Sequence, residues 1–313
     1  MRVLFCSESF PAAPRVLQSR LPEDEVVTCP ADAVWDALAG VDVVIPAMVC
    51  IDAATMDAGR FRLIQQWGAG LEGVDVPAAR ERGIWVANVP SHVTPNAVAV
   101  AELALLLILA LLRHLPQAQA NVRAGLLGEP MGQSLAGRTV CLVGVGGVGG
   151  ALGRRLQPFG VELIGVGRRP AGPHLAELGL ARYYQLGELH AALAAADVVV
   201  LCLPLVPETR GLIDAAALAC LKPTAYLVNV ARGPLIDYDA LRAALAAGRL
   251  AGAGLDVYWQ EPFPPDDPLL RYNVIATPHM GGITDQAYAG IADAIAANVE
   301  RLRRGEPPLY RAW

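Results

Sequence analysis

The chain carries few charges and few aromatic residues for its length of 313 residues. Charged residues make up 18% and the formal net charge is −5, so no basic surface for nucleic acid is expected. Aromatic residues make up 6%, which also argues against platforms on which nucleic-acid bases stack. Hydrophobic residues reach 54%, enough for a large core, and the length favours two domains over one.

Paired cysteines, targeting segments and long hydrophobic runs are missing as well. None of the six cysteines belongs to a C-x-x-C pair and no histidine stands at a metal-ligand spacing, so we expect reduced thiols, no metal site and a cytoplasmic location. The N-terminal apolar run is too short for a signal peptide. The most apolar stretch, Ala97 to Leu112, contains Glu102 and is shorter than the ~20 residues of a membrane-spanning helix. No membrane association is therefore expected.

What the sequence does contain is a repeated alternation of short β-rich runs and helical runs. In the first hundred residues, the predicted strands include VDVVIPA, RLIQQWG and IWVANV. A second series begins at TVCLVG and ends near NVIATPHMGG, and the tail TDQAYAGIADAIAANVERLRRG is a predicted helix that returns to the first domain. This alternation predicts an α/β fold with two doubly wound parallel sheets.

A glycine loop joins the first strand of the second series to the following helix. Gly144, Gly146 and Gly149 form a G-x-G-x-x-G pattern in TVCLVGVGGVGGALGRRL. Between a strand and a helix this pattern predicts a dinucleotide site, because glycines permit the tight turn, the approach of a pyrophosphate and close helix–strand packing. Gly147 and Val148 lie at the helix N-terminus, whose N–H groups would bind phosphate. A glycine-rich turn without a ligand is the alternative.

The acidic residue that usually follows the second strand of a dinucleotide-binding fold is absent. Such a residue bonds the hydroxyl groups of the adenosine ribose. Here the strand VELIGV is followed by Gly167, Arg168 and Arg169, and Glu162 lies at the start of the strand, the wrong end. A glycine leaves room for a 2′-phosphate, and guanidinium groups pair with phosphate. The pattern favours NADP(H) over NAD(H); two solvated surface arginines with a loose choice of cofactor are the alternative.

Four polar residues interrupt apolar segments of the second series. Arg232 follows the strand in YLVNVARGPLID, and Asp256 lies in the strand of AGAGLDVYWQEP. Glu261 follows in the same segment, and His279 comes after the strand in VIATPHMGG. Ligands of open α/β sheets bind beyond the carboxyl ends of strands, so these residues are candidates for an active site. Taken singly, each could be a turn cap, a structural acid, a surface residue or a core histidine.

Five motifs carry a resemblance that covers nearly the whole chain. They are VGVGGVGGALGRRLQPFG, LCLPLVPETRGLI, VNVARGPLID, GLDVYWQEP and TPHMGG. In this order they resemble the D-isomer-specific 2-hydroxyacid dehydrogenase family, and the Gly–Arg pattern after the second strand is similar to that of NADPH-dependent glyoxylate/hydroxypyruvate reductases. The resemblance implies a discontinuous, flavodoxin-like substrate domain, residues 1–98 and 285–313, and a Rossmann cofactor domain, residues 99–284.

The resemblance also implies a role for each candidate residue. Arg232 would hold the substrate carboxylate and polarise its keto oxygen, and His279 would act as the general acid or base. Glu261 would orient the imidazole and favour its protonated form, and Asp256 would contact the nicotinamide carboxamide. The other cofactor contacts implied are Pro204, Thr209 and Ala231, and the implied substrate loop comprises Ala69, Gly70 and Leu71.

By the same resemblance, the expected reaction is hydride transfer between a nicotinamide and a small 2-oxo or 2-hydroxy acid. The apolar helix that begins near Val98 matches the family's interdomain helix and implies a homodimer. A dinucleotide sensor that binds protein partners, like the carboxy-terminal-binding-protein corepressors, could keep the same motifs. An NAD-using hydroxyacid dehydrogenase is another alternative. Turnover of a simple oxo acid separates the sensor from an enzyme.

Overall fold

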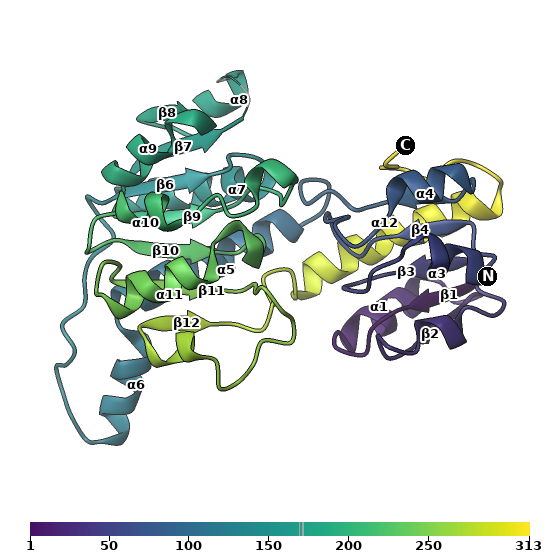
Figure 1. The fold of residues 1–313 in the computed structure, drawn as a ribbon, viewed down its shortest axis with the longest axis horizontal. Coiled ribbons are helices and arrows are strands. Elements are labelled where there is room, and N and C mark those ends of the chain that lie inside the picture. Colours follow the sequence, from purple (N-terminus) through teal and green to yellow (C-terminus); the bar gives the residue numbers. More distant parts are fainter. Residues whose placement is uncertain (169, 171) are drawn as a thin grey trace. The chain divides into compact units, whose positions relative to one another are not determined.

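The computed structural model describes residues 1–168, 170 and 172–313 (Figure 1). Its internal contacts divide the chain into two compact units. The first unit comprises Met1–Asn96 and Ile283–Trp313, and the second comprises Ala97–Gly282. Each division point lies two residues before the one expected from the sequence.

The first unit is built on a five-stranded sheet of order β2-β1-β3-β4-β5, in which every neighbouring pair is parallel. Its strands are β1 (Arg2–Phe5), β2 (Glu25–Thr28), β3 (Val43–Ile45), β4 (Leu63–Gln65) and β5 (Trp85–Ala87). Its helices are α1 (Ala12–Arg20), α2 (Val34–Ala37), α3 (Ala53–Ala58), α4 (Val76–Glu81) and α12 (Asp285–Arg303). This strand order is the flavodoxin-like one that was predicted.

Both faces of the first sheet are buried, since side chains alternate along each strand. Val3 and Phe5 face a core that includes residues of α1 and α12, whereas Leu4 faces the core formed with α2, α3 and α4. Helix α12 follows the whole second unit in the chain and packs beside α1 (Figure 1). The first unit is therefore assembled from both ends of the sequence.

The second unit contains a seven-stranded sheet of order β12-β11-β10-β9-β6-β7-β8, again with parallel neighbours. Its strands are β6 (Thr139–Val143), β7 (Glu162–Gly167), β8 (Arg182–Gln185), β9 (Val198–Leu201), β10 (Tyr226–Asn229), β11 (Gly252–Leu255) and β12 (Val274–Ala276). Because β6 lies between β7 and β9, the strand order reverses there, which is where Rossmann folds bind dinucleotides. The predicted α/β class with two doubly wound sheets is confirmed.

The helices of the second unit cover both faces of its sheet. They are α5 (Asn96–Leu112), α6 (Leu115–Arg123), α7 (Gly147–Leu156), α8 (Pro173–Ala176), α9 (Leu189–Ala195), α10 (Ala215–Ala219) and α11 (Tyr238–Ala246). Short 3₁₀ turns lie at Gln157–Phe159, Leu186–Glu188, Pro207–Thr209, Gly233–Leu235 and Pro268–Arg271. One core contains residues of α5 and α7, and the other contains residues of α9, α10 and α11.

Helix α5 is apolar because most of its residues lie in the core of the second unit. In the described part of the chain, no single helix is both long and apolar enough to cross a membrane. Helices α5 and α6 pass that test only as a pair, and the pair is bent by 59°.

Several local predictions need correction. Strand β8 was not predicted, because its sequence RYYQ begins with a charged residue, ends with an amide and contains no run of aliphatic residues. The segment ADAVWDALAG, whose composition and final glycine predict a longer helix, forms only the single turn α2. Asp256 lies one residue beyond β11 rather than inside a strand, and Gly167 is the last residue of β7 rather than the residue after it.

Candidate active site

The glycine loop follows β6 and crosses the end of β9. Gly144 has a φ of +99°, a left-handed conformation that favours glycine, and its N–H donates to the Val166 carbonyl at 2.8 Å. A Cβ at Gly144 would lie 2.8 Å from backbone atoms of Cys202 and Leu203. The turn therefore depends on glycine both for its conformation and for its packing against the neighbouring strand.

The other two glycines of the pattern differ in what surrounds them. A Cβ at Gly149 would lie 1.9 Å from the Gly144 carbonyl oxygen, so the helix can approach the turn only without a side chain there. A Cβ at Gly146 would meet nothing within 4 Å. Gly146 caps α7, where no described side chain satisfies the first N–H groups; Gly147 and Val148 are the first residues of the helix. Open space before an uncapped helix N-terminus suits a pyrophosphate.

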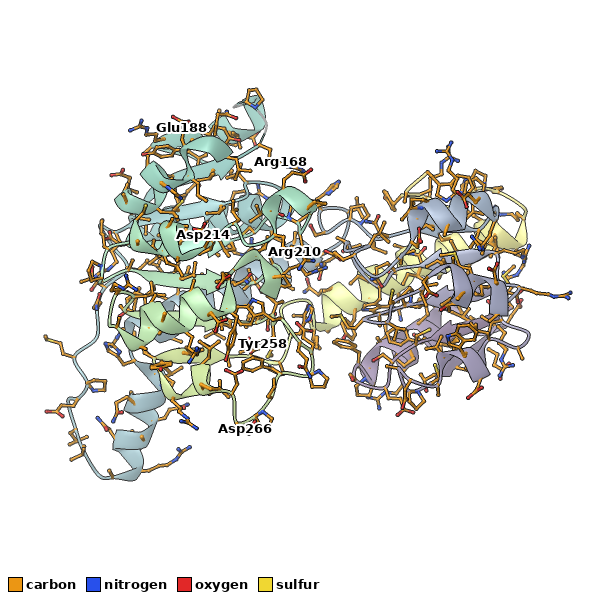
Figure 2. All side chains as sticks on the ribbon, viewed as in Figure 1. Arg168, Glu188, Arg210, Asp214, Tyr258 and Asp266 are labelled. Atoms are coloured by element: carbon orange, nitrogen blue, oxygen red, sulfur yellow. The ribbon has the colours of Figure 1, made fainter. Side chains whose placement is uncertain are left out.

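The end of β7 lies beside β8, and this contact restricts what residue 167 can be. Gly167 pairs with Gln185 of β8, and a Cβ at Gly167 would lie 2.2 Å from the hydroxyl oxygen of Tyr183. An aspartate or glutamate at position 167 would require the Tyr183 side chain to move. Arg168 is exposed at the end of β7 (Figure 2), whereas Arg169 lies outside the described residues.

The loop after β9 is closed by Thr209, which is 1% exposed. Its hydroxyl accepts from the Val206 N–H at 2.9 Å and donates either to the Pro204 carbonyl at 2.9 Å or to the Val206 carbonyl at 3.1 Å. The Thr209 side chain thus shapes the loop from within. A cofactor contact at this segment would come from the loop backbone and from Pro204.

Arg232 follows β10 on a turn that the buried Asn229 side chain supports. The Asn229 amide accepts from the Ala231 N–H at 3.0 Å and donates to the Arg232 carbonyl at 2.8 Å. A Cβ at Gly233 would lie 2.1 Å from the Tyr258 carbonyl carbon, so glycine is required there. The half-buried Arg232 guanidinium donates to the Ala231 carbonyl at 2.7 Å and presents a planar cation at this sheet edge.

Asp256 is 1% exposed and accepts three hydrogen bonds. Its donors are the Thr277 hydroxyl at 2.7 Å and the N–H groups of Met280 and Gly281, both at 2.8 Å. Burial raises the pKa of the Asp256 carboxyl, and these bonds and the charge of His279 offset only part of that effect. Asp256 therefore holds the segment that carries His279.

Glu261 and His279 form a close pair. The His279 Nδ1 lies 2.6 Å from the Glu261 Oε2, and the other carboxylate oxygen accepts from the Tyr258 N–H at 3.0 Å. Burial would raise the pKa of Glu261, but the hydrogen bond with His279 and the positive charges of His279 and Arg232 lower it. An ionised Glu261 accepts a hydrogen bond from the Nδ1–H of His279 and fixes the proton on that nitrogen. The other ring nitrogen, Nε2, is not engaged with Glu261.

The backbone at His279 adopts a left-handed conformation that non-glycine residues rarely take, with a φ of +51°. Its N–H donates to the Thr277 carbonyl at 2.9 Å, and the same carbonyl faces the Tyr258 hydroxyl at 2.8 Å. Tyr258, labelled in Figure 2, also stacks on Phe263 with ring centroids 4.2 Å apart. These contacts stabilise the unfavourable backbone conformation of the turn and hold the imidazole in hydrogen-bonding distance of Glu261.

The second unit thus brings Arg232, Asp256, Glu261 and His279 to the carboxyl edge of β10, β11 and β12. The glycine loop lies at the carboxyl end of β6 in the same sheet. The arrangement combines a helix N-terminus that suits an anion, the Arg232 cation and a histidine that is hydrogen-bonded to a carboxylate. These groups can bind a dinucleotide, hold an anion and transfer one proton.

The loop with Ala69, Gly70 and Leu71 belongs to the first unit and follows β4. The carbonyl of Gly68 accepts from the Val89 N–H at 2.7 Å, and the carbonyl of Ala69 accepts from the Asn88 side chain at 2.6 Å. The N–H groups of residues 69 to 71 donate to none of the residues that the structure describes. Successive unpaired N–H groups in a loop suit a carboxylate.

Sequence reasoning missed four residues that shape these sites, namely Asn88, Tyr183, Asn229 and Thr277. Asn229 alone left a signal, since it is the one amide in the apolar run YLVNVA. The contacts of the others come from strand ends that meet only in the folded sheet.

Known proteins resemble the chain at both the sequence and the structural level. The profile described as the D-isomer specific 2-hydroxyacid dehydrogenase, NAD binding domain, matches residues 105–281. A glyoxylate reductase of Thermofilum pendens is 36% identical over 272 residues, which covers 82% of this chain and 77% of the relative. One from Pyrococcus furiosus is 37% identical over 261 residues, covering 80% and 76%. The NADPH-dependent glyoxylate/hydroxypyruvate reductase of Sinorhizobium meliloti, solved with NADP and malonate, has a TM-score of 0.85 at 33% identity, covering 99% of this chain and 96% of that one.

Proposed function

Since the chain belongs to the D-isomer-specific 2-hydroxyacid dehydrogenase family, we propose that it transfers a hydride between NADP(H) and a small 2-oxo or 2-hydroxy acid. Glyoxylate and hydroxypyruvate are the proposed substrates of the reducing direction. The observation that carries the proposal is the His279–Glu261 pair at 2.6 Å, on the same sheet edge as Arg232 and the glycine loop. We propose the second unit as the cofactor domain and the first as the substrate domain.

In the proposed mechanism, two side chains act on the substrate, and a third, Glu261, acts through His279. The Arg232 guanidinium pairs with the carboxylate and polarises the keto oxygen. The nicotinamide, when bound, supplies the hydride that adds to the keto carbon. His279 donates its Nε2 proton to the keto oxygen, so that a hydroxyl group forms, and Glu261 stabilises the imidazolium before the transfer. The reverse reaction uses neutral His279 as the base.

The dinucleotide would lie across the glycine loop, with its pyrophosphate against the N-terminus of α7. The open space at Gly146 and the uncapped helix support this placement. Ala231, Pro204 and the loop closed by Thr209 would line the nicotinamide half. The Asp256 carboxylate has roughly four acceptor positions, and the three bonds described above use three of them. The remaining position would accept a hydrogen bond from the nicotinamide carboxamide.

The preference for NADP(H) over NAD(H) rests on the end of β7. Gly167 provides no carboxylate to repel a 2′-phosphate, the Tyr183 hydroxyl occupies the space where such a side chain would begin, and Arg168 is exposed beside it. The Sinorhizobium meliloti relative is described with NADP. Arg169 is proposed as a second phosphate contact from the sequence alone.

The proposed substrate loop of the first unit, Ala69 to Leu71, would bind the substrate carboxylate through backbone N–H groups. A homodimer is also proposed. Exposed apolar side chains are concentrated on α6 and the segment after it, with Val122 at 76%, Leu127 at 95% and Met131 at 90% exposure. A patch of this kind is typical of a protein interface. A cytoplasmic location is proposed from the six free cysteines.

The first test is the initial rate of glyoxylate and hydroxypyruvate reduction, with NADPH and NADH side by side. We expect turnover of both acids and a higher kcat/KM for NADPH. Equal rates with both cofactors would contradict the hypothesis that Gly167 and Arg168 at the end of β7 favour NADP(H). Dinucleotide binding without turnover of any 2-oxo acid would contradict the enzyme and favour a sensor.

A substitution tests the role of Arg232. Arg232→Ala removes a charged, bidentate partner of the carboxylate, so kcat/KM should fall roughly 10²- to 10⁴-fold while the dissociation constant of NADPH changes little. Arg242→Ala is the control, because Arg242 pairs with Asp239 on the surface of α11 and such pairs contribute little. Retained turnover in Arg232→Ala would remove this residue from the mechanism.

A further inference from the structure

The Asn88 side chain connects two segments of the first unit that follow neighbouring strands. Asn88 comes directly after β5, and its Nδ2 lies 2.6 Å from the Ala69 carbonyl oxygen in the loop after β4. A carbonyl oxygen only accepts hydrogen bonds, so the nitrogen of the amide must face it. The next residue, Val89, donates its N–H to the Gly68 carbonyl at 2.7 Å. Two successive carbonyls of the loop are thus held from β5.

Holding the Ala69 carbonyl also determines where the next N–H points. The carbonyl of Ala69 and the N–H of Gly70 belong to one peptide group, which is planar and trans, so the two bonds point in opposite directions. With the oxygen directed at Asn88, the Gly70 N–H is directed away from β5. That N–H donates to no residue in the described ranges, 1–168, 170 and 172–313. It is one of the N–H groups proposed above to bind the substrate carboxylate.

Asn88 itself is held by the C-terminal segment of the chain. Its backbone N–H donates to the Tyr310 carbonyl at 3.3 Å, and Ala87 pairs with Arg311 in an antiparallel bridge. The Ala312 N–H donates to the Val86 carbonyl at 2.8 Å. Trp313 stacks on Trp85 of β5, with ring centroids 4.7 Å apart and planes 18° from parallel. Residues 310–313 therefore cover the open edge of β5 and restrain the residue that carries the amide.

We propose that Asn88 is a positioning residue for substrate binding, which sets the direction of the Gly70 N–H toward the carboxylate of the 2-oxo acid. This inference rests on the proposed function. Asn88 does not touch the reacting atoms; it acts through one peptide group. Loss of the Asn88 amide should weaken carboxylate binding and leave dinucleotide affinity unchanged, because the glycine loop lies in the other unit.

The test compares Asn88→Ala and Asn88→Asp with the wild type. Alanine removes the donor, and aspartate keeps the shape but presents oxygens to the Ala69 carbonyl. Gln286→Ala is the control, an amide on the exposed side of α12 in the same unit. The measurements are KM and kcat for glyoxylate, competitive inhibition by oxalate, the dissociation constant of NADPH and the melting temperature.

We expect both Asn88 variants to raise the KM for glyoxylate and the inhibition constant of oxalate by roughly three- to tenfold, the effect of one lost hydrogen bond. The value of kcat, NADPH binding and the control should stay within about twofold of the wild type. A purely structural role would instead lower the melting temperature and weaken both ligands, which would overturn the inference.

Two further outcomes separate this inference from the proposed function. Wild-type turnover with unchanged KM and oxalate inhibition in both variants would overturn the role of Asn88 and leave the function standing. A wild type that does not reduce glyoxylate or any other 2-oxo acid would contradict the proposed function and this inference together.

Discussion

The glycine loop allows a prediction that separates cofactor binding from folding. Gly146→Ala and Gly149→Ala each add one methyl group, three residues apart in the sequence. At Gly146 the added Cβ meets nothing within 4 Å and φ is −80°, so the backbone needs no left-handed conformation. At Gly149 the Cβ would lie 1.9 Å from the Gly144 carbonyl oxygen. The first change should spare the fold and the second should not.

The expected magnitudes follow from these surroundings. Gly146→Ala should change the free energy of unfolding by less than about 1 kcal/mol, in either direction. The methyl group would keep the pyrophosphate from the helix N–H groups, each worth roughly 1.5–3 kcal/mol toward a charged acceptor, so dinucleotide affinity should fall about tenfold to a hundredfold or more. Gly149→Ala should cost at least ~1–3 kcal/mol of stability, because a backbone oxygen cannot rotate away as a side chain can.

The assay combines urea unfolding with a fluorescence titration of NADPH. Gly187→Ala serves as the control, because a Cβ there also meets nothing within 4 Å and the residue lies in the same unit, in the turn after β8. Unchanged NADPH affinity in Gly146→Ala would refute the placement of the pyrophosphate. Unchanged stability in Gly149→Ala would refute the packing argument for the helix.

Three other predictions concern the cofactor, the acid–base pair and the interface. Gly167→Asp alone should bind both cofactors poorly, because its Cβ would lie 2.2 Å from the Tyr183 hydroxyl, whereas Gly167→Asp with Tyr183→Phe should shift the kcat/KM ratio toward NADH; an unchanged ratio would count against the reading of this site. The pKa of Glu261 is lowered in the folded state. The ionised Glu261 side chain therefore stabilises the fold at pH values above the ordinary carboxyl pKa of 4.5, and this stabilisation is lost as the pH falls through the lowered pKa. The difference in melting temperature between wild type and Glu261→Gln should therefore shrink in acid, and a constant difference would argue against the ion pair with His279. Leu127→Asp should convert the proposed dimer to monomer in a light-scattering measurement, and a monomeric wild type would exclude the dimer.

The fold could be predicted from the sequence because its elements are local and repeated. Short runs rich in valine and isoleucine predicted most strands, and their alternation with helical runs predicted the parallel sheets. Strand β8 escaped because RYYQ lacks an apolar run and gains its place by pairing with β7. Family membership was confirmed, since its motifs extend along the chain.

The site could be predicted in its residues but not in its contacts. Sequence patterns selected Arg232, Glu261 and His279, and the structure brings the last two to 2.6 Å, yet their roles stay predictions. Nothing in the sequence indicated that Asp256 would accept three hydrogen bonds, since its donors at Thr277, Met280 and Gly281 are 21 to 25 residues away in the chain. Such bonds depend on the register between β11 and β12, which composition does not determine.

The proposed catalytic groups are joined by one polar network across three strand ends. The Asn229 side chain holds the turn that carries Arg232, and the Asn229 carbonyl accepts from the Asp256 N–H at 3.0 Å. The Asp256 carboxylate in turn holds the segment that carries His279. These bonds, between 2.8 and 3.0 Å long, join the backbone segments that carry Arg232 and His279 through the buried Asn229 and Asp256. Segments held at strand ends in this way need less ordering when a ligand binds than segments on long loops, which is the advantage that we expect of preorganised groups.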